Sequence, residues 1–150
     1  MFNLRRVTEG GQQMIPRYRV WDKQTERMHI VSGIDFNDGL VSSVNIWHEG
    51  WPWVLEPDEI VLMQSTGLKD KNGVEIFEGD VVLVSVQNGF DYLDNKVCIV
   101  KNSIGHSGLV CATVDEDLEY RIFNTELFEE YTYEVIGNIY ENSELLEEVK

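Results

Sequence analysis

The sequence predicts a mainly β protein, with a small closed barrel in the C-terminal half, a β-rich part before it and a short C-terminal helix. Apolar and polar residues alternate with a period of two in several segments, as they do in half-buried strands. Clusters of Gly, Asn and Asp divide the second half into four or five short strands, a spacing typical of small barrels. With 150 residues and 43% apolar side chains, the chain is long enough for one domain with a core.

The N-terminal half begins with a hairpin. Residues 17–22 and 27–36 alternate in polarity, and a polar turn at 23–26 joins them. Residues 39–47 are expected to form a third strand, because the preceding Asn-Asp-Gly sequence favours a turn. Residues 59–65 form either another strand or a short helix that starts after Pro57.

Between these strands, the segment "WHEGWPWVLEPDEI" carries three tryptophans close together, Trp47, Trp51 and Trp53. Gly50 and Pro52 break regular structure, so we expect a loop here. Two interpretations stay open for its indoles. They pin the loop across the core, or they form an exposed platform that binds a partner or a second subunit.

The C-terminal half supplies the expected barrel strands, at residues 80–87, 96–102, 108–114, 120–123 and 133–140. Closing them into a barrel would remove the strand edges that invite aggregation. A helical turn capped by Asn124 is expected at 124–131, and a helix capped by Asn142 or Ser143 at 142–150.

The net charge of −15 is unevenly distributed, with +3 over residues 1–30, −8 over 31–110 and −10 over 111–150. A field of this sign repels phosphates, so we expect no direct binding of nucleic acid. It suits a basic protein partner, the imitation of a nucleic acid, or solubility alone. No apolar run could span a membrane and no secretory signal follows Arg5 and Arg6, so we expect a cytoplasmic protein that binds no membrane.

Residues 1–13 show no clear alternation, and the regular pattern begins at Met14. The codons of Glu9-Gly10-Gly11 can resemble a bacterial ribosome-binding site a few codons before Met14. We therefore expect Met14 to be the natural start, with residues 1–13 as an upstream extension. The alternative is an N-terminal arm that carries the basic residues Arg5 and Arg6.

The stretch "LMQSTGLKDKNGVEIFEGDVVLVSV", residues 62–86, invites a ligand, but two calcium-loop frames fail on it. As a phosphate loop it lacks the Gly-Lys-Ser/Thr ending and the following helix. Asn72-Gly73 is a strong turn signal, because both residues tolerate positive φ. Gly79 permits a bend before a strand that begins at Asp80. We expect these four residues to form a structural hinge between two lobes.

No pattern of catalytic or metal-binding residues stands out. The residues that could serve, His29, His48, His106, Cys98 and Cys111, are scattered without the pair spacing that zinc requires. His106 and Ser107 would point to opposite faces of one strand. The two cysteines lie in strand-like runs, where buried free thiols are expected, with a disulfide as the alternative. We expect no cofactor and no metal, and an enzyme with a site built across subunits remains a third class of function.

Three segments resemble the YopX family of phage and prophage proteins. "MIPRYRVWDKQTERM" is similar to the opening of the family, "LMQSTGLKDKNGVEIFEGDVV" to its most diagnostic segment and "YEVIGNIYENSELLE" to its closing strand and helix, with Ser143 where the family often has proline. The resemblance implies one domain over residues 14–150. It contains an N-terminal β-rich part at 14–64 and an SH3-like barrel with the C-terminal helix at 65–150. It also implies that the protein forms oligomers and comes from a phage or prophage. It provides no catalytic residue.

We therefore expect a non-enzymatic accessory protein that works through protein contacts, as a homo-oligomer or with a basic host or phage protein. Aromatic residues anchor such interfaces, and the candidates here are Trp47, Trp51, Trp53, Phe90 and Tyr92. The alternative is an acidic mimic of nucleic acid that occupies a basic host protein.

Overall fold

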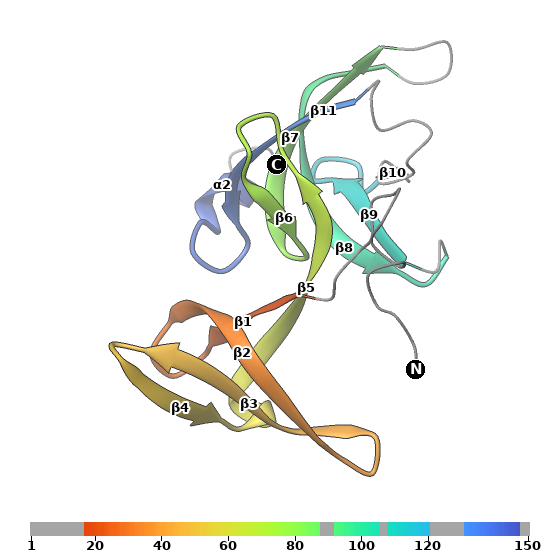
Figure 1. Ribbon diagram of the computed structural model, residues 1–150. Coiled ribbons are helices and arrows are strands. Elements are labelled where there is room, and N and C mark those ends of the chain that lie inside the picture. Colours follow the sequence, from red (N-terminus) through yellow and green to blue (C-terminus); the bar gives the residue numbers. More distant parts are fainter. Residues whose placement is uncertain (1–16, 88–91, 106–107, 121–130, 148–150) are drawn as a thin grey trace, which may run out of the picture.

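The computed structural model describes residues 17–87, 92–105, 108–120 and 131–147, which form two antiparallel sheets (Figure 1). The first sheet has the strand order β4-β3-β2-β1-β5-β6, and the second has the order β10-β9-β8-β7-β11. The first contains β1 (Tyr18–Asp22), β2 (Arg27–Asn37), β3 (Leu40–His48), β4 (Trp51–Leu55), β5 (Ile60–Lys69) and β6 (Glu75–Phe77). The second contains β7 (Asp80–Gln87), β8 (Tyr92–Ser103), β9 (Gly108–Thr113), β10 (Glu119–Tyr120) and β11 (Tyr131–Asn138). The mainly β prediction is confirmed.

The predicted tryptophan loop is wrong, because residues 51–55 form the strand β4. Glu49 and Gly50 both have positive φ, at 52° and 81°, and this geometry makes a two-residue hairpin turn between β3 and β4. Pro52 does not interrupt the strand, since β4 is the edge strand of its sheet and has β3 as its one neighbour. Proline is tolerated at such edges. A short 3₁₀ helix, η1 (Pro57–Glu59), then leads into β5.

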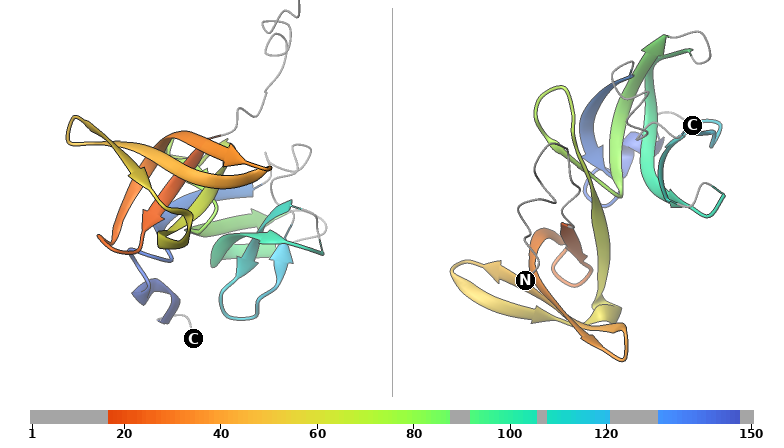
Figure 2. Two further views of the ribbon diagram at one scale, coloured as in Figure 1. Left: turned by 90° about the horizontal axis from the view of Figure 1, so that it is seen from below. Right: turned by 45° about the vertical axis from the view of Figure 1, so that its right-hand side comes forward.

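The long strand β5 connects the two lobes (Figure 2). Its first half, residues 60–64, pairs with β1, and its second half pairs with β6 at Ser65↔Phe77 and Lys69↔Glu75. The predicted boundary between residues 64 and 65 therefore falls inside β5, at the change of partner. The alternative of a helix here is wrong.

Each lobe has its own core. In the first sheet, Val20, Val44, Ile46, Leu55 and Ile60 are buried together. In the second, valines of β7 pack with residues of β8, β9 and β11, and Ile76 of β6 joins them. The strand β6 thus contributes a buried residue to the second core although it belongs by pairing to the first sheet.

The closed barrel is not confirmed, because no ladder among the described residues joins β10 to β11. Some predicted element ends also differ: β8 begins four residues earlier than the expected strand at 96–102, and β11 spans 131–138 instead of 133–140. The C-terminal helix α2 covers Glu144–Glu147. Residues 1–13, Phe90, His106 and Ser107 lie outside the described residues, as does the predicted helical turn at 124–131 except for Tyr131, which begins β11.

Candidate functional site

Two regions combine unusual residues, the bend before β7 and the hairpin β3–β4. The bend is built on Gly79, whose φ is +90°. Its N–H donates to the Val100 carbonyl at 2.7 Å, and its carbonyl accepts from the Ile139 N–H at 3.0 Å. A side chain would be strained by the positive φ and crowded, because a Cβ atom at this position would lie 3.0 Å from the Met63 Sδ.

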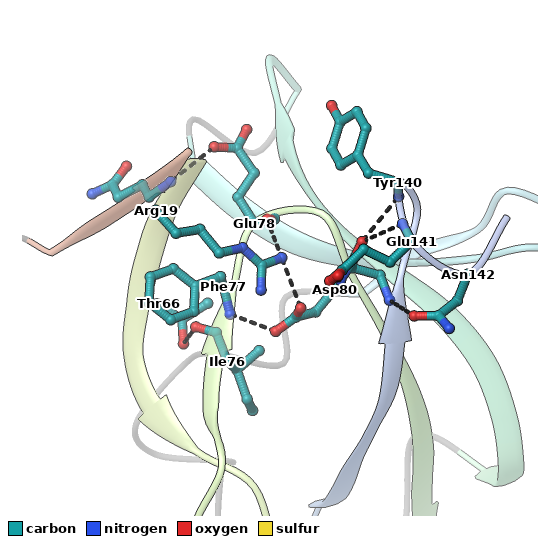
Figure 3. Close-up of polar contacts among 11 residues, drawn as sticks. Arg19, Thr66, Ile76, Phe77, Glu78, Asp80, Tyr140, Glu141 and Asn142 are labelled. Carbon is teal, nitrogen blue, oxygen red and sulfur yellow. Dashed lines mark hydrogen bonds and ion pairs between the residues drawn. The ribbon is translucent and has the colours of Figure 1, made fainter. Parts of the chain in front are cut away.

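An ion pair beside this bend ties the first sheet to the second (Figure 3). The Arg19 Nη2 of β1 lies 2.7 Å from the Asp80 Oδ1 of β7, and both side chains are largely buried. The second oxygen of Asp80 accepts from the Phe77 N–H at 2.8 Å, and Arg19 also donates to the Glu78 carbonyl. Its guanidinium lies over the Phe77 ring. Burial raises the pKa of Asp80, whereas the Arg19 charge and the Phe77 N–H oppose that rise.

The turn that follows β5 is equally occupied by the protein's own groups. Asp70 accepts from the N–H groups of Asn72 and Val74 with Oδ1, and from the Val135 N–H of β11 with Oδ2. Burial raises its pKa, but these three bonds outweigh burial and lower the pKa overall. Gly73 adopts φ +82° in the turn. The stretch that invited a ligand therefore uses its carboxylates to hold its own backbone.

The two cysteines are free and buried, as expected. Burial raises the pKa of Cys98 to about 12 and that of Cys111 well above its usual range, so neither thiol is poised to form a nucleophilic thiolate. Among the described residues, no group of three or more His, Cys, Asp or Glu side chains is arranged to hold a metal ion. In the bend and the second core, these carboxylates and thiols are thus buried or bound to groups of the same chain.

The hairpin β3–β4 differs, because its large side chains are uncovered. Trp47, Trp51, Trp53 and Val54 are 64%, 71%, 51% and 62% exposed. The interpretation that the indoles pin the chain across the core is therefore wrong. Val54 was not among the predicted contact residues, although the Glu-Gly pair between two apolar runs is a signal for this turn.

The pairing register shows that the three indoles do not share one face. Trp53 lies opposite Ile46, a core residue, and Trp51 lies opposite His48, so both point to the core side of the sheet. Trp47 lies opposite Pro52 and points to the other side. The hairpin therefore offers apolar surface on both of its faces.

A pocket of about 340 Å³ lies on the core side of this hairpin. Trp53, Ile46 and Glu49 contribute to its wall, together with two histidines. The rings of His29 and His48 meet edge to face, with centroids 5.0 Å apart. Burial, and then the neighbouring His48, lower the pKa of His29, which favours its neutral form. The contact between His29 and His48 could not be predicted from the sequence, because strand pairing brings together residues that lie far apart in the chain.

Tyr92 is the other predicted contact residue that the structure describes. Its side chain is 69% exposed, but it lies in the other lobe. It begins β8, whose start is at the top of Figure 1, whereas β4 is at the bottom. The structure thus brings Trp51 and Trp53 together and separates Tyr92 from them.

Part of the acidic surface is neutralised within the second lobe. Lys96 forms an ion pair with Asp115, and Lys101 contacts Asp117 at 3.0 Å and Glu119 at 3.5 Å. The acidic turn after β9 is therefore less negative than its sequence indicates. In the part of the chain that the structure describes, no helix has the length and apolar character needed to cross a membrane.

Comparison with known proteins places this fold in a family. The chain is similar to protein EF1440 from Enterococcus faecalis, with 28% identity and a TM-score of 0.61 over 89% of this chain and 99% of that one. It is also similar in fold to protein yopX from Bacillus subtilis, with 22% identity and a TM-score of 0.56 over 86% and 96%. No curated protein matches the chain. The model of the family described as YopX protein matches residues 17–147, so the chain belongs to the YopX family.

Proposed function

We propose that this protein is a non-enzymatic binding protein that acts through protein contacts at the hairpin β3–β4. The observation that carries the proposal is the exposure of Trp47, Trp51, Trp53 and Val54 on one hairpin. Soluble proteins rarely leave apolar side chains clustered in water unless the surface is used. Tryptophan is also among the residues that contribute most to binding at interfaces.

The proposal includes the architecture of the protein and the cell in which it acts. The second lobe forms an SH3-like barrel that acts as the scaffold. The protein serves a phage or prophage in the cytoplasm of a bacterial host. It functions as a homo-oligomer or with a basic protein partner. Supporting the binding role, Cys98, Cys111, Asp70 and Asp80 are each buried or fully engaged.

The test is affinity capture from infected host cells with the wild-type chain and with Trp51→Ala/Trp53→Ala. The double variant should lose the captured partner or the self-assembly while keeping its near-UV circular dichroism. Leu40→Ala is the matched control, since Leu40 is 73% exposed but lies at the opposite end of β3. Equal capture by both variants would refute a role for the hairpin.

The alternative function, imitation of a nucleic acid, draws on the charge of −15. Both this function and the proposed role of the hairpin would explain why a basic partner binds. Capture that disappears with salt and survives Trp51→Ala/Trp53→Ala supports mimicry. Capture that resists salt and requires the indoles supports the hairpin.

A further inference from the structure

The two sheets have four edges, of which β4 is the one best suited to another strand. In the part of the chain that the structure describes, β6 has three residues, and the β10 edge ends at Tyr120, next to residues outside the described part. The edge of β11 is covered, because the Lys71 N–H donates to the Tyr133 carbonyl and Asp70 accepts from the Val135 N–H. The fourth edge, β4, has five residues, and four of them are exposed. An uncovered edge strand is a template for pairing with another chain.

The register of the hairpin identifies which main-chain groups of β4 face outward. A two-residue turn places its flanking residues, His48 and Trp51, in a hydrogen-bonded pair. Hydrogen-bonded and non-hydrogen-bonded pairs then alternate along an antiparallel ladder. Trp53 and Leu55 therefore direct their N–H and C=O groups toward β3, whereas Pro52 and Val54 direct theirs away from it.

Three outward groups remain: the carbonyl of Pro52 and both the N–H and the carbonyl of Val54. Pro52 occupies an outward position, where its missing N–H costs no bond to β3. The same absence shortens the usable edge, because an incoming strand finds no donor at this residue. Val54 is thus the one residue of β4 that can exchange two hydrogen bonds with an added antiparallel strand.

Acidic side chains flank this edge, and the pocket on its core side holds one cation, Arg27, among its lining residues. Glu49 precedes β4 and its side chain is 76% exposed, and the exposed residues Glu56 and Asp58 follow it. A second copy of the chain would bring another −15 to the same place, which opposes pairing of two β4 edges. A basic segment is complementary to this charge.

We propose that β4 accepts an extended, basic segment of a partner protein as an additional antiparallel strand, held at Val54. This proposal rests on the proposed binding function and specifies its partner. The side chain opposite Trp53 lies on the core side, at a non-hydrogen-bonded pair where side chains are closest. An arginine or lysine there stacks on the indole and lies near Glu49 at the rim of the pocket.

The probe is the synthetic peptide Arg-Val-Arg-Val-Arg-Val, and its control is Arg-Pro-Arg-Pro-Arg-Pro, which has the same charge but lacks alternate N–H groups. Binding is measured by calorimetry and located by amide hydrogen exchange. We expect the first peptide to bind at least about tenfold more tightly and to slow exchange of the Val54 N–H. Equal binding of the two peptides would show charge attraction alone and overturn the proposal.

The variant Val54→Pro removes the outward N–H without touching the ladder to β3, and Val54→Thr is the matched control. Val54→Pro should lower the affinity for the valine peptide by about tenfold, and Val54→Thr should retain it. If Val54→Pro loses its near-UV dichroism, the exchange measurement on the wild-type chain decides alone. A wild-type protein that sediments as a dimer, and as a monomer when it carries Val54→Pro, would assign the edge to a second copy and overturn the proposal.

The failure of this inference can be distinguished from that of the proposed function. If Val54→Pro still captures the cellular partner and Trp51→Ala/Trp53→Ala does not, the hairpin binds through its faces, and the added strand is refuted. If neither variant changes capture, the function itself is refuted.

Discussion

The bend at Glu78–Asp80 and the hairpin β3–β4 differ in what surrounds their side chains. The bend carries Gly, Asp and Glu, residues typical of ligand loops, yet its carboxylate binds Arg19 and a backbone N–H of the same chain. The hairpin carries tryptophans typical of a core, yet they are exposed. The comparison teaches that residue type indicates what a segment can do, whereas the neighbouring strands determine what it does. The following predictions test this contrast, from the largest expected effect to the smallest.

Removing the buried cation should have the largest effect on stability. Arg19→Ala leaves the Asp80 carboxylate buried with the Phe77 N–H as its remaining bond, and should cost about 3–5 kcal/mol of unfolding free energy. Arg17→Ala is the control, because its ion pair with Glu75 is half exposed and should contribute less than about 1 kcal/mol. Denaturant unfolding measures both. Similar losses would show that the pair is not the link between the lobes.

The turn carboxylate should contribute less and with a defined dependence on pH. Asp70→Asn leaves one of three backbone N–H groups without an acceptor, at a cost of about 2–3 kcal/mol. Because the folded pKa of Asp70 is lowered, its stabilisation is full above the unfolded pKa and is lost as the pH falls through the folded pKa.

Unfolding of wild type and Asp70→Asn across that acidic range gives the readout, and the two curves should converge toward low pH. Asp35→Asn serves as the comparison, since exposed Asp35 accepts from the Ser43 and Asn45 side chains only. A constant gap between wild type and Asp70→Asn at all pH values would contradict the assignment.

Substitutions at Gly79 and Gly73 distinguish the cost of backbone strain from the cost of steric crowding. Gly79→Ala combines positive φ with a Cβ atom 3.0 Å from the Met63 Sδ, and should destabilise the protein by about 1–3 kcal/mol. Gly73→Ala has a similar φ but open space within 4 Å, so it should cost about 1 kcal/mol. Thermal unfolding distinguishes them. If Gly73→Ala costs as much, crowding at the bend is unimportant.

The smallest effect on stability is expected at the hairpin. Trp47→Ala should change the unfolding free energy by less than about 1 kcal/mol, because the indole is exposed. Its neighbour Ile46 is 2% exposed, and Ile46→Ala should cost about 2–4 kcal/mol. These two adjacent residues of β3 thus compare the exposed face of the sheet with its buried face. A large loss for Trp47→Ala would mean that the indole packs against the protein after all.

Much of the fold follows from local pattern. Alternation located β1, β2, β3, β7 and β9 to within about two residues, the usual uncertainty at element ends. The Asn72-Gly73 turn and the Gly79 bend adopt the positive φ angles that glycine permits. The strand β4 was missed, because "WPWVL" does not alternate. Because β4 is exposed on both faces, its sequence lacks the alternation of apolar and polar residues from which strands are predicted.

The sequence by itself determined most of the strands, the turns at Gly73 and Gly79 and the family of this protein, since each depends on neighbouring residues or on a contiguous motif. The tertiary structure alone decided that Arg19 meets Asp80 across 61 positions, that β5 pairs with β1 over one half and with β6 over the other and that β4 remains an edge. These features depend on which strands pair over long separations in the chain. A local pattern shows that a strand has an apolar side but carries no record of the partner that covers it.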